Sequence, residues 1–209
     1  MTRARYRFLA SPLRRLATAC LLAAALMPFA GPAMPSSKQL ALILPDYPIP
    51  PKSDTMLFYL QRSNNSNTVV YEANLRRRGE LNQDNPVKVY WIRYNTNGKR
   101  RALKTTERMF AFGIESERIR RNEFRVHLVS YEERKARVFI DKDGRPRATM
   151  KVAGRQAILR WAYVTVDTGG VTPSVEKVDL FGEDLATGKM LHEQITPQDA
   201  DSADDQRAE

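Results

Sequence analysis

Met56-Leu-Phe-Tyr-Leu-Gln61 and Thr68-Val-Val-Tyr-Glu-Ala-Asn-Leu75 stand on either side of Ser63-Asn-Asn-Ser-Asn67. The two outer stretches are rich in β-branched and aromatic residues, which favour strands. Serine and asparagine side chains bond to their own backbone, and asparagine tolerates left-handed geometry, so the middle stretch predicts a turn. Together the three stretches predict a β-hairpin, and the rest of the chain repeats this pattern.

Further strand-like stretches follow, separated by turn signals such as Asn95-Thr-Asn-Gly98 and Asp141-Lys-Asp-Gly144. We expect strands at 87–94, 123–131, 137–140, 148–152, 156–166, 175–181 and 190–195. Only 103–112 predicts a helix, because apolar and charged residues mix there and Gly113 is a natural stop. Eight or nine strands, short turns and one short helix predict a mainly β fold, an antiparallel barrel or sandwich.

The N-terminus has the features of a secretory signal peptide over residues 1–33. Five arginines and no acid precede the uncharged run 16–30, and small residues at 31–33 offer a cleavage site before Met34. The run is shorter than the roughly 20 apolar residues of a membrane-spanning helix, which favours cleavage over an anchor. We therefore expect an exported protein, periplasmic or secreted, of a bacterial envelope. The export route, general or twin-arginine, stays open.

The rest of the chain divides into three parts. Residues 34–53 contain five prolines and predict an extended lead-in, while 54–195 should form a single β-rich domain. The acidic, polar stretch 196–209 predicts a disordered tail. The only cysteine, Cys20, leaves with the signal peptide, which excludes disulfides and cysteine nucleophiles from the mature chain.

The charge is uneven along the chain. The whole sequence has a net charge of +10, and the five signal-peptide arginines contribute half of it. Residues 34–198 remain basic, whereas 199–209 contain five acids and one arginine. A basic body attracts anions, so an anionic lipid surface is one candidate partner and an ordinary solvated surface is the other interpretation. Export argues against nucleic acid as a partner.

Several blocks of the sequence resemble a known family. They are Met56–Arg62, Asn67–Asn74, Pro86–Tyr94, Phe110–Gly113, Asp179–Gly182 and Thr187–Lys189. Over roughly residues 55 to 195 the chain resembles the bacterial family known as domain of unknown function 4833. The resemblance implies an exported bacterial protein with a single domain. It implies no particular activity and supplies no functional residues.

No motif in the sequence specifies a reaction. The chain has no Gly-x-Ser-x-Gly elbow, no Gly-x-Gly-x-x-Gly loop and no Walker loop. His127 and His192 have no metal-ligand spacing around them, so we expect neither a metal site nor a cofactor.

The strand 87–94 offers the best candidate for a ligand site. Trp91 and Arg93 share one face of it, an arrangement suited to an anionic ligand with an apolar body. Alternatively, Arg93 lies at a rim and pairs with Glu72 or water. His127 shares a face of its strand with Val129 and Tyr131, and it would need an orienting carboxylate to act as a general base.

These observations lead to two functional hypotheses. The first is a non-enzymatic envelope protein that binds an unidentified small molecule or envelope component, with Glu72, Trp91, Arg93 and His127 as candidate ligand-binding residues. The alternative is an envelope hydrolase of unknown substrate, in which Glu72, Arg93 and His127 take part. The oligomeric state stays open.

Overall fold

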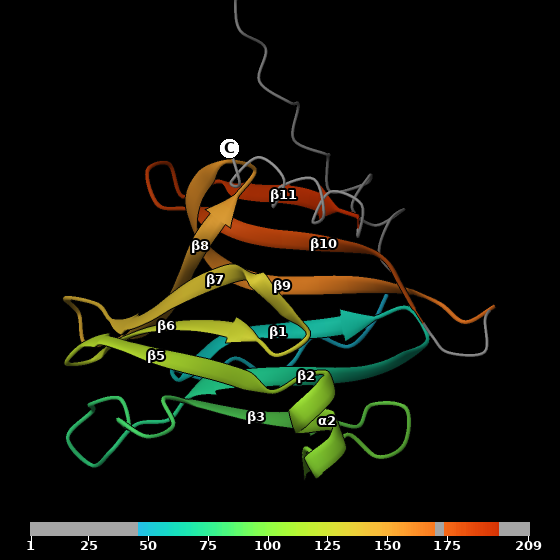
Figure 1. Ribbon diagram of the computed structural model, residues 1–209, viewed down its shortest axis with the longest axis horizontal. Helices are drawn as coiled ribbons and strands as arrows, with labels where there is room; N and C mark the ends of the chain where they lie inside the picture. The colour runs from blue at the N-terminus through green and yellow to red at the C-terminus, as the bar shows by residue number, and fades with distance from the viewer. Residues whose placement is uncertain (1–45, 170–173, 197–209) are drawn as a thin grey trace, which may run out of the picture. The chain divides into compact units, whose positions relative to one another are not determined.

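The described residues form one sheet of eleven strands and one short helix (Figure 1). The structure, a computed structural model, describes residues 46–169 and 174–196, all within one unit of the chain. The elements are β1 (Met56–Arg62), β2 (Asn65–Ala73), β3 (Val87–Ile92), β4 (Arg100–Ala102), α2 (Thr105–Phe110), β5 (Ile114–Arg120), β6 (Glu123–Leu128), β7 (Tyr131–Ile140), β8 (Pro146–Val152), β9 (Arg155–Asp167), β10 (Ser174–Asp184) and β11 (Met190–Ile195). The predicted mainly β fold with one short helix is therefore confirmed.

The sheet is organised around β9, its longest described strand. The strand order is β4-β3-β2-β1-β9-β8-β7-β6-β5, and β10 and β11 branch off β9. The first part of β9 pairs with β8 and its later part with β1, while β10 runs along the other edge. All described pairs are antiparallel except β1 with β9, where Tyr59 stands opposite Trp161 in parallel.

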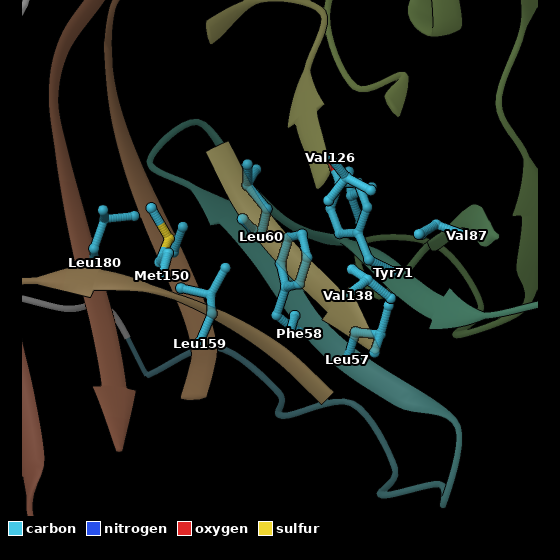
Figure 2. Packing of buried hydrophobic residues seen from close by; sticks show 14 of the residues in the cluster. Leu57, Phe58, Leu60, Tyr71, Val87, Val126, Val138, Met150, Leu159 and Leu180 are labelled. Carbon is cyan, nitrogen blue, oxygen red and sulfur yellow. The ribbon is translucent and has the colours of Figure 1, made fainter. Parts of the chain in front are cut away.

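The sheet curls around its core. Tyr71 of β2 and Phe124 and Val126 of β6 belong to one buried cluster, although four strands separate β2 from β6 in the sheet (Figure 2). A flat sheet would hold these side chains far apart, since neighbouring strands lie about 4.8 Å from each other. Phe58 stacks on Tyr71 at 4.4 Å between ring centroids, which places aromatic packing at the centre of the enclosed face.

Side-chain contacts join the two ends of the curled sheet, and we call this junction the seam. The Tyr71 hydroxyl donates to the backbone oxygen of Phe112 at 3.2 Å, and the Trp91 ring meets the Phe112 ring edge-on at 5.0 Å. Nearby, the backbone N–H of Leu81 donates to Asn122 Oδ1 at 3.0 Å. Phe112 follows α2, so the β4–α2–β5 connection also crosses the seam.

Two strands were not predicted, and the boundary between the expected strands 123–131 and 137–140 was misplaced. The short β4 and the edge strand β5 add to the expected count. The expected strand 123–131 ends at Leu128, and Tyr131 begins β7 after a two-residue turn. Val129 and Tyr131 therefore do not share a strand with His127. Ser130 holds this turn by donating from its hydroxyl to the backbone oxygen of Ala111 at 2.7 Å.

The described part of the lead-in, residues 46–53, is irregular and is held by hydrogen bonds to the sheet. The Tyr47 hydroxyl donates to Ser63 O at 3.1 Å, and Gln61 Nε2 donates to Pro48 O at 3.1 Å. The expected signal peptide and acidic tail lie outside the described residues. Within the described ranges, no helix has the length and apolar character needed to cross a bilayer.

Candidate functional site

A small cationic pocket lies where the ends of several strands meet α2. Its volume is about 280 Å³, and four basic side chains, one acid, one amide and one indole line it: Arg62, Asn67, Trp91, Arg93, Arg101, Lys104 and Glu107. Trp91 and Arg93, which the sequence analysis placed together, both belong to it. We call it the Arg62 pocket.

Strand register places most of these side chains. In the β1–β2 hairpin Arg62 pairs with Asn65, which brings Asn67 to the same end of the sheet. In the β3–β4 hairpin Trp91 stands directly opposite Arg101. The turn after β3 is fixed in place because Asn67 Oδ1 accepts a hydrogen bond from the backbone N–H of Asn95 at 3.2 Å.

Glu107 is a tethered carboxylate within the pocket. It accepts hydrogen bonds from Arg101 Nη2 and from the backbone N–H of Lys104, each at 2.7 Å. Burial alone would raise the pKa of Glu107, but these bonds and the charge of Arg101 outweigh it and lower the pKa below its ordinary value. Glu107 therefore stays ionised and neutralises Arg101.

Arg62 carries the unusual charge of the pocket. Its guanidinium carbon lies 5.4 Å from the centroid of Trp91 and 5.9 Å from that of Phe112, which is cation–π range. Its Nε is buried and has no hydrogen-bond partner within the described ranges. Among the described residues, no carboxylate lies within 4.0 Å of its guanidinium. Burial lowers the pKa of Arg62, and the charge of Glu107 acts in the opposite direction.

The pocket therefore holds more positive charge than its own acid can balance. Arg101 is paired with Glu107, whereas Arg62, Arg93 and Lys104 form no ion pair with any described residue. A half-buried guanidinium without a counter-ion is costly, and a bound anion would remove that cost. Guanidinium groups also match the planar oxygen pairs of carboxylate and phosphate.

Glu72 lies on the opposite face of the sheet from Trp91. Tyr71 faces the core, so the alternation of the strand turns Glu72 outward. Its Oε1 accepts from the Tyr90 hydroxyl at 2.9 Å and from Ser53 Oγ at 3.1 Å. The structure therefore does not bring Glu72 to the pocket, nor does it pair Glu72 with Arg93.

His127 lies in β6, outside the Arg62 pocket. Its Nε2 is 3.4 Å from Glu115 Oε2 on the neighbouring β5, and that carboxylate is largely exposed. The three residues of the hydrolase hypothesis, Glu72, Arg93 and His127, thus have separate surroundings. They do not form one constellation in the structure.

Sequence reasoning missed a buried histidine–aspartate pair on β10 and β11. His192 Nε2 lies 2.7 Å from Asp179 Oδ1, and Gln194 Nε2 donates to the same oxygen at 3.1 Å. Asp179 is fully buried, and the Phe181 ring stacks on His192 at 4.7 Å. Among the described side chains, His192 is hydrogen-bonded only to Asp179, so the pair has no hydroxyl nucleophile. Had β10 and β11 been paired as a hairpin from the sequence, the contact would have been predictable.

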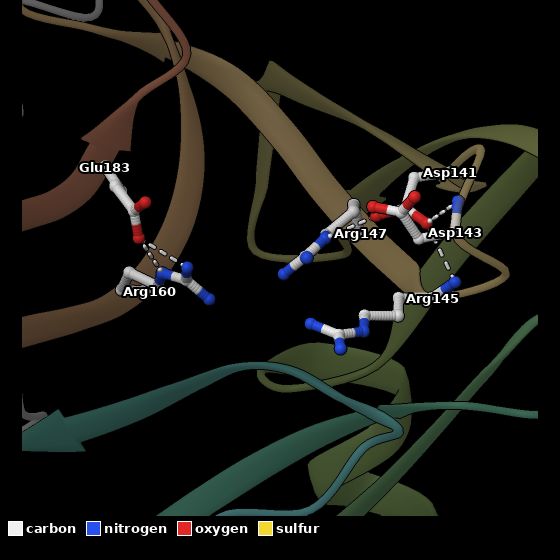
Figure 3. A network of polar contacts seen from close by, with 6 residues as sticks. All are labelled: Asp141, Asp143, Arg145, Arg147, Arg160 and Glu183. Carbon is white, nitrogen blue, oxygen red and sulfur yellow. Dashed lines mark hydrogen bonds and ion pairs between the residues drawn. The ribbon is translucent and has the colours of Figure 1, made fainter. Parts of the chain in front are cut away.

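Outside the pocket, several charged groups are bound to each other. In the turn after β7, Asp141 Oδ1 accepts from the backbone N–H groups of Asp143 and Arg145 at 2.9 and 2.8 Å, and Arg147 Nε donates to Oδ2 at 2.9 Å (Figure 3). These bonds, led by that from Arg145, lower the pKa of Asp141. The predicted hairpin turn is thus stabilised by its own aspartate. The described residues contain no group of three His, Cys, Asp or Glu side chains that could hold a metal ion.

A larger groove of about 1410 Å³ lies over β7, β8 and β11. Its half-buried arginine is matched, since Arg134 pairs with Glu193, and Arg137 pairs with Glu123 at 2.5 Å; the charges in its lining that pair with no described residue, such as Lys135 and Lys151, are exposed to solvent. Although this groove is larger, it lacks the unbalanced, desolvated charge that distinguishes the Arg62 pocket.

A known family model covers nearly the whole sheet. Residues 58–194, about two thirds of the chain, match the model of a family described as "Domain of unknown function (DUF4833)". No curated protein and no solved structure matches the chain. The matched range includes every residue of the Arg62 pocket.

Proposed function

The chain belongs to the DUF4833 family, and we propose that it is an exported, non-enzymatic envelope protein that binds a small anion in the Arg62 pocket. The observation that carries the proposal is the half-buried Arg62 guanidinium, which has a buried, unpartnered Nε and no counter-ion among the described residues. The export part of the proposal rests on the signal-like sequence 1–33.

The dimensions and lining of the pocket indicate the class of ligand. Its volume of about 280 Å³ is just below the roughly 300–1,000 Å³ of small-molecule sites, so the ligand must be small. A phosphate or carboxylate headgroup with a compact apolar extension fits this size. Arg62, Arg93 and Lys104 supply the positive charge, and the Trp91 ring, which is 4% exposed, forms part of the wall.

The same lining supports binding rather than chemistry. The pocket has one carboxylate, and Glu107 already accepts hydrogen bonds from Arg101 and the Lys104 backbone. A general base must reach the proton that it removes, and Glu107 is held by its donors instead. The other lining side chains are amide, indole and cationic groups.

Tryptophan fluorescence offers a direct test. The chain has two tryptophans, so a Trp161→Phe variant leaves Trp91 in the pocket as the single reporter. We expect a saturable change in emission on titration with hexyl phosphate and none with hexanol. In this background, Arg62→Gln should weaken hexyl phosphate binding by at least about tenfold, because hydrogen bonds to charged groups contribute roughly 1.5–3 kcal/mol. Arg118→Gln, an exposed arginine of β5, should bind as the parent does.

Two results would contradict the proposal. One is the lack of any saturable response to hexyl phosphate in a parent protein whose circular dichroism shows a folded sheet. The other is an Arg62→Gln variant with the affinity of its parent. If neither result is found, native mass spectrometry of the protein purified from its own envelope can identify the natural ligand class. The ligand would be seen as an extra mass that disappears on denaturation.

A further inference from the structure

Two large apolar side chains are exposed beside the Arg62 pocket. Met109 and Phe110, in the last turn of α2, are 58 and 73% exposed. The helix buries none of its residues. Short helices in proteins are normally stabilised by an apolar face that packs on the core. The apolar end of α2 therefore serves no packing purpose among the described residues.

The apolar pair is surrounded by positive charge. Residues 99–110 contain five basic residues and one acid: Lys99, Arg100, Arg101, Lys104, Arg108 and Glu107. Arg101 is neutralised by Glu107, and Arg100 lies 3.8 Å from Glu72. Lys99, Lys104 and Arg108 are exposed and form no ion pair with a described residue.

This combination is typical of segments that lie in a membrane interface. In such segments aromatic and aliphatic side chains enter the boundary between headgroups and acyl chains, while lysines and arginines meet anionic headgroups. Other large apolar side chains of this protein are also exposed, but Met109 and Phe110 are adjacent to each other and lie in a segment with basic residues that pair with no described residue.

The helix also connects the apolar pair to the pocket. Lys104 and Glu107 line the pocket, and Met109 and Phe110 follow in the same short segment. At about 1.5 Å per residue, the pair lies within about 9 Å of Lys104 along the helix axis. In the chain α2 follows β4, an edge strand of the sheet, and Figure 1 shows α2 near β3.

We propose that residues 99–110 dock the protein onto an anionic phospholipid bilayer. Met109 and Phe110 enter the acyl boundary, and the exposed basic residues contact lipid phosphates. The Arg62 pocket then receives an anionic headgroup at the same surface. This last step rests on the proposed function, whereas docking itself does not.

Vesicle sedimentation tests the docking surface. The probes are vesicles of equal parts phosphatidylglycerol and phosphatidylcholine, with pure phosphatidylcholine vesicles as the uncharged reference. We expect the mature full chain to bind the anionic vesicles and to dissociate as salt rises well above about 0.1 M. The Lys104→Gln, Arg108→Gln double variant should lose about fivefold in partitioning for each charge removed.

A Met109→Ser, Phe110→Ser double variant tests insertion. Both side chains are exposed, so the fold should be unaffected, and partitioning should fall about tenfold or more. The matched control is Val175→Ser, Leu185→Ser, which removes two other exposed apolar side chains, 46 and 55% exposed. It should bind vesicles as the unmodified chain does.

The hexyl phosphate titration separates the two proposals. Docking is supported if the Met109→Ser, Phe110→Ser double variant loses vesicle binding but keeps its affinity for hexyl phosphate. Vesicle binding that this variant retains overturns docking, because charge alone then explains attachment and an acidic soluble partner fits equally well. Lack of vesicle binding by the unmodified chain also overturns docking, and hexyl phosphate binding then shows whether the pocket proposal survives.

Discussion

Gly182 of β10 occupies a position where the sheet leaves no room for a side chain. A Cβ atom there would lie 2.8 Å from the Cβ of Ala157, 3.1 Å from Val152 Cγ2 and 3.2 Å from the backbone oxygen of Ile158. The nearest atom is a β-carbon fixed to the backbone of β9, so it cannot rotate away. The φ of Gly182 is not in the left-handed region, so a substitution acts through these contacts alone.

The cost of Gly182→Ala can be estimated from two opposing effects. Extra volume in a well-packed region costs about 1–3 kcal/mol. Alanine restricts the unfolded chain more than glycine does, which returns about 0.5–1 kcal/mol. We therefore expect the free energy of unfolding to fall by about 1–2 kcal/mol, measured by urea denaturation.

A double-mutant cycle tests the reason for this loss. Ala157→Gly removes the atom at 2.8 Å, so it should relieve Gly182→Ala with a coupling energy of about 1 kcal/mol. Gly188→Ala is the matched control. Gly188 has φ +67, and a Cβ atom added to it would have no neighbour within 4 Å. The free energy of unfolding lost in Gly188→Ala should therefore simply add to that lost in Ala157→Gly. A Gly182→Ala variant as stable as the unmodified protein, or a coupling energy of zero, would refute the packing argument.

Two further substitutions test buried charges. Hydrogen bonds, first that from Arg137, lower the pKa of Glu123. The ionised Glu123 therefore stabilises the fold fully above the ordinary carboxyl pKa. This contribution is lost as the pH falls through the lowered pKa of the folded state. Glu123→Gln should cost about 2 kcal/mol at neutral pH, and this cost should start to shrink near pH 4 and disappear as the pH falls through the lowered pKa, by urea denaturation across that range; a pH-independent loss would contradict this. His192→Leu leaves the buried Asp179 carboxylate with Gln194 as its described donor and should cost about 3 kcal/mol. Adding Asp179→Asn should recover part of that loss, and strict additivity would argue against a coupled pair.

Strands with local signals were predictable, and strands defined only by pairing were not. The β1–β2 hairpin carries both strand-forming runs and its own turn residues, so its existence follows from a short segment. By contrast, β5 reads Ile-Glu-Ser-Glu-Arg-Ile-Arg and exposes nearly every side chain, because it is an edge strand. Its backbone bonds to β6 form without an apolar alternation, and periodicity therefore gave no signal.

The candidate site was predictable only within one strand. Trp91 and Arg93 are two residues apart, so the period of a strand places them together. Arg62 joins them only through the pairing of β1, β2 and β3, whose register depends on the loop 74–86. The same register sends Glu72 to the other face. Local patterns cannot supply that information, which explains why Glu72 was grouped with Arg93.

The Arg62 pocket is a consequence of how the sheet closes. Phe112 contacts Trp91 edge-on, and the Arg62 guanidinium lies over both rings. The seam therefore supplies the aromatic surroundings that desolvate the cation. A ligand that binds only this closed arrangement must stabilise it by mass action. An anion in the pocket would thus stabilise the seam as well as occupy a site. Under the proposed function, the unbalanced charge of Arg62 is therefore a cost to the unliganded fold that a bound anion would offset.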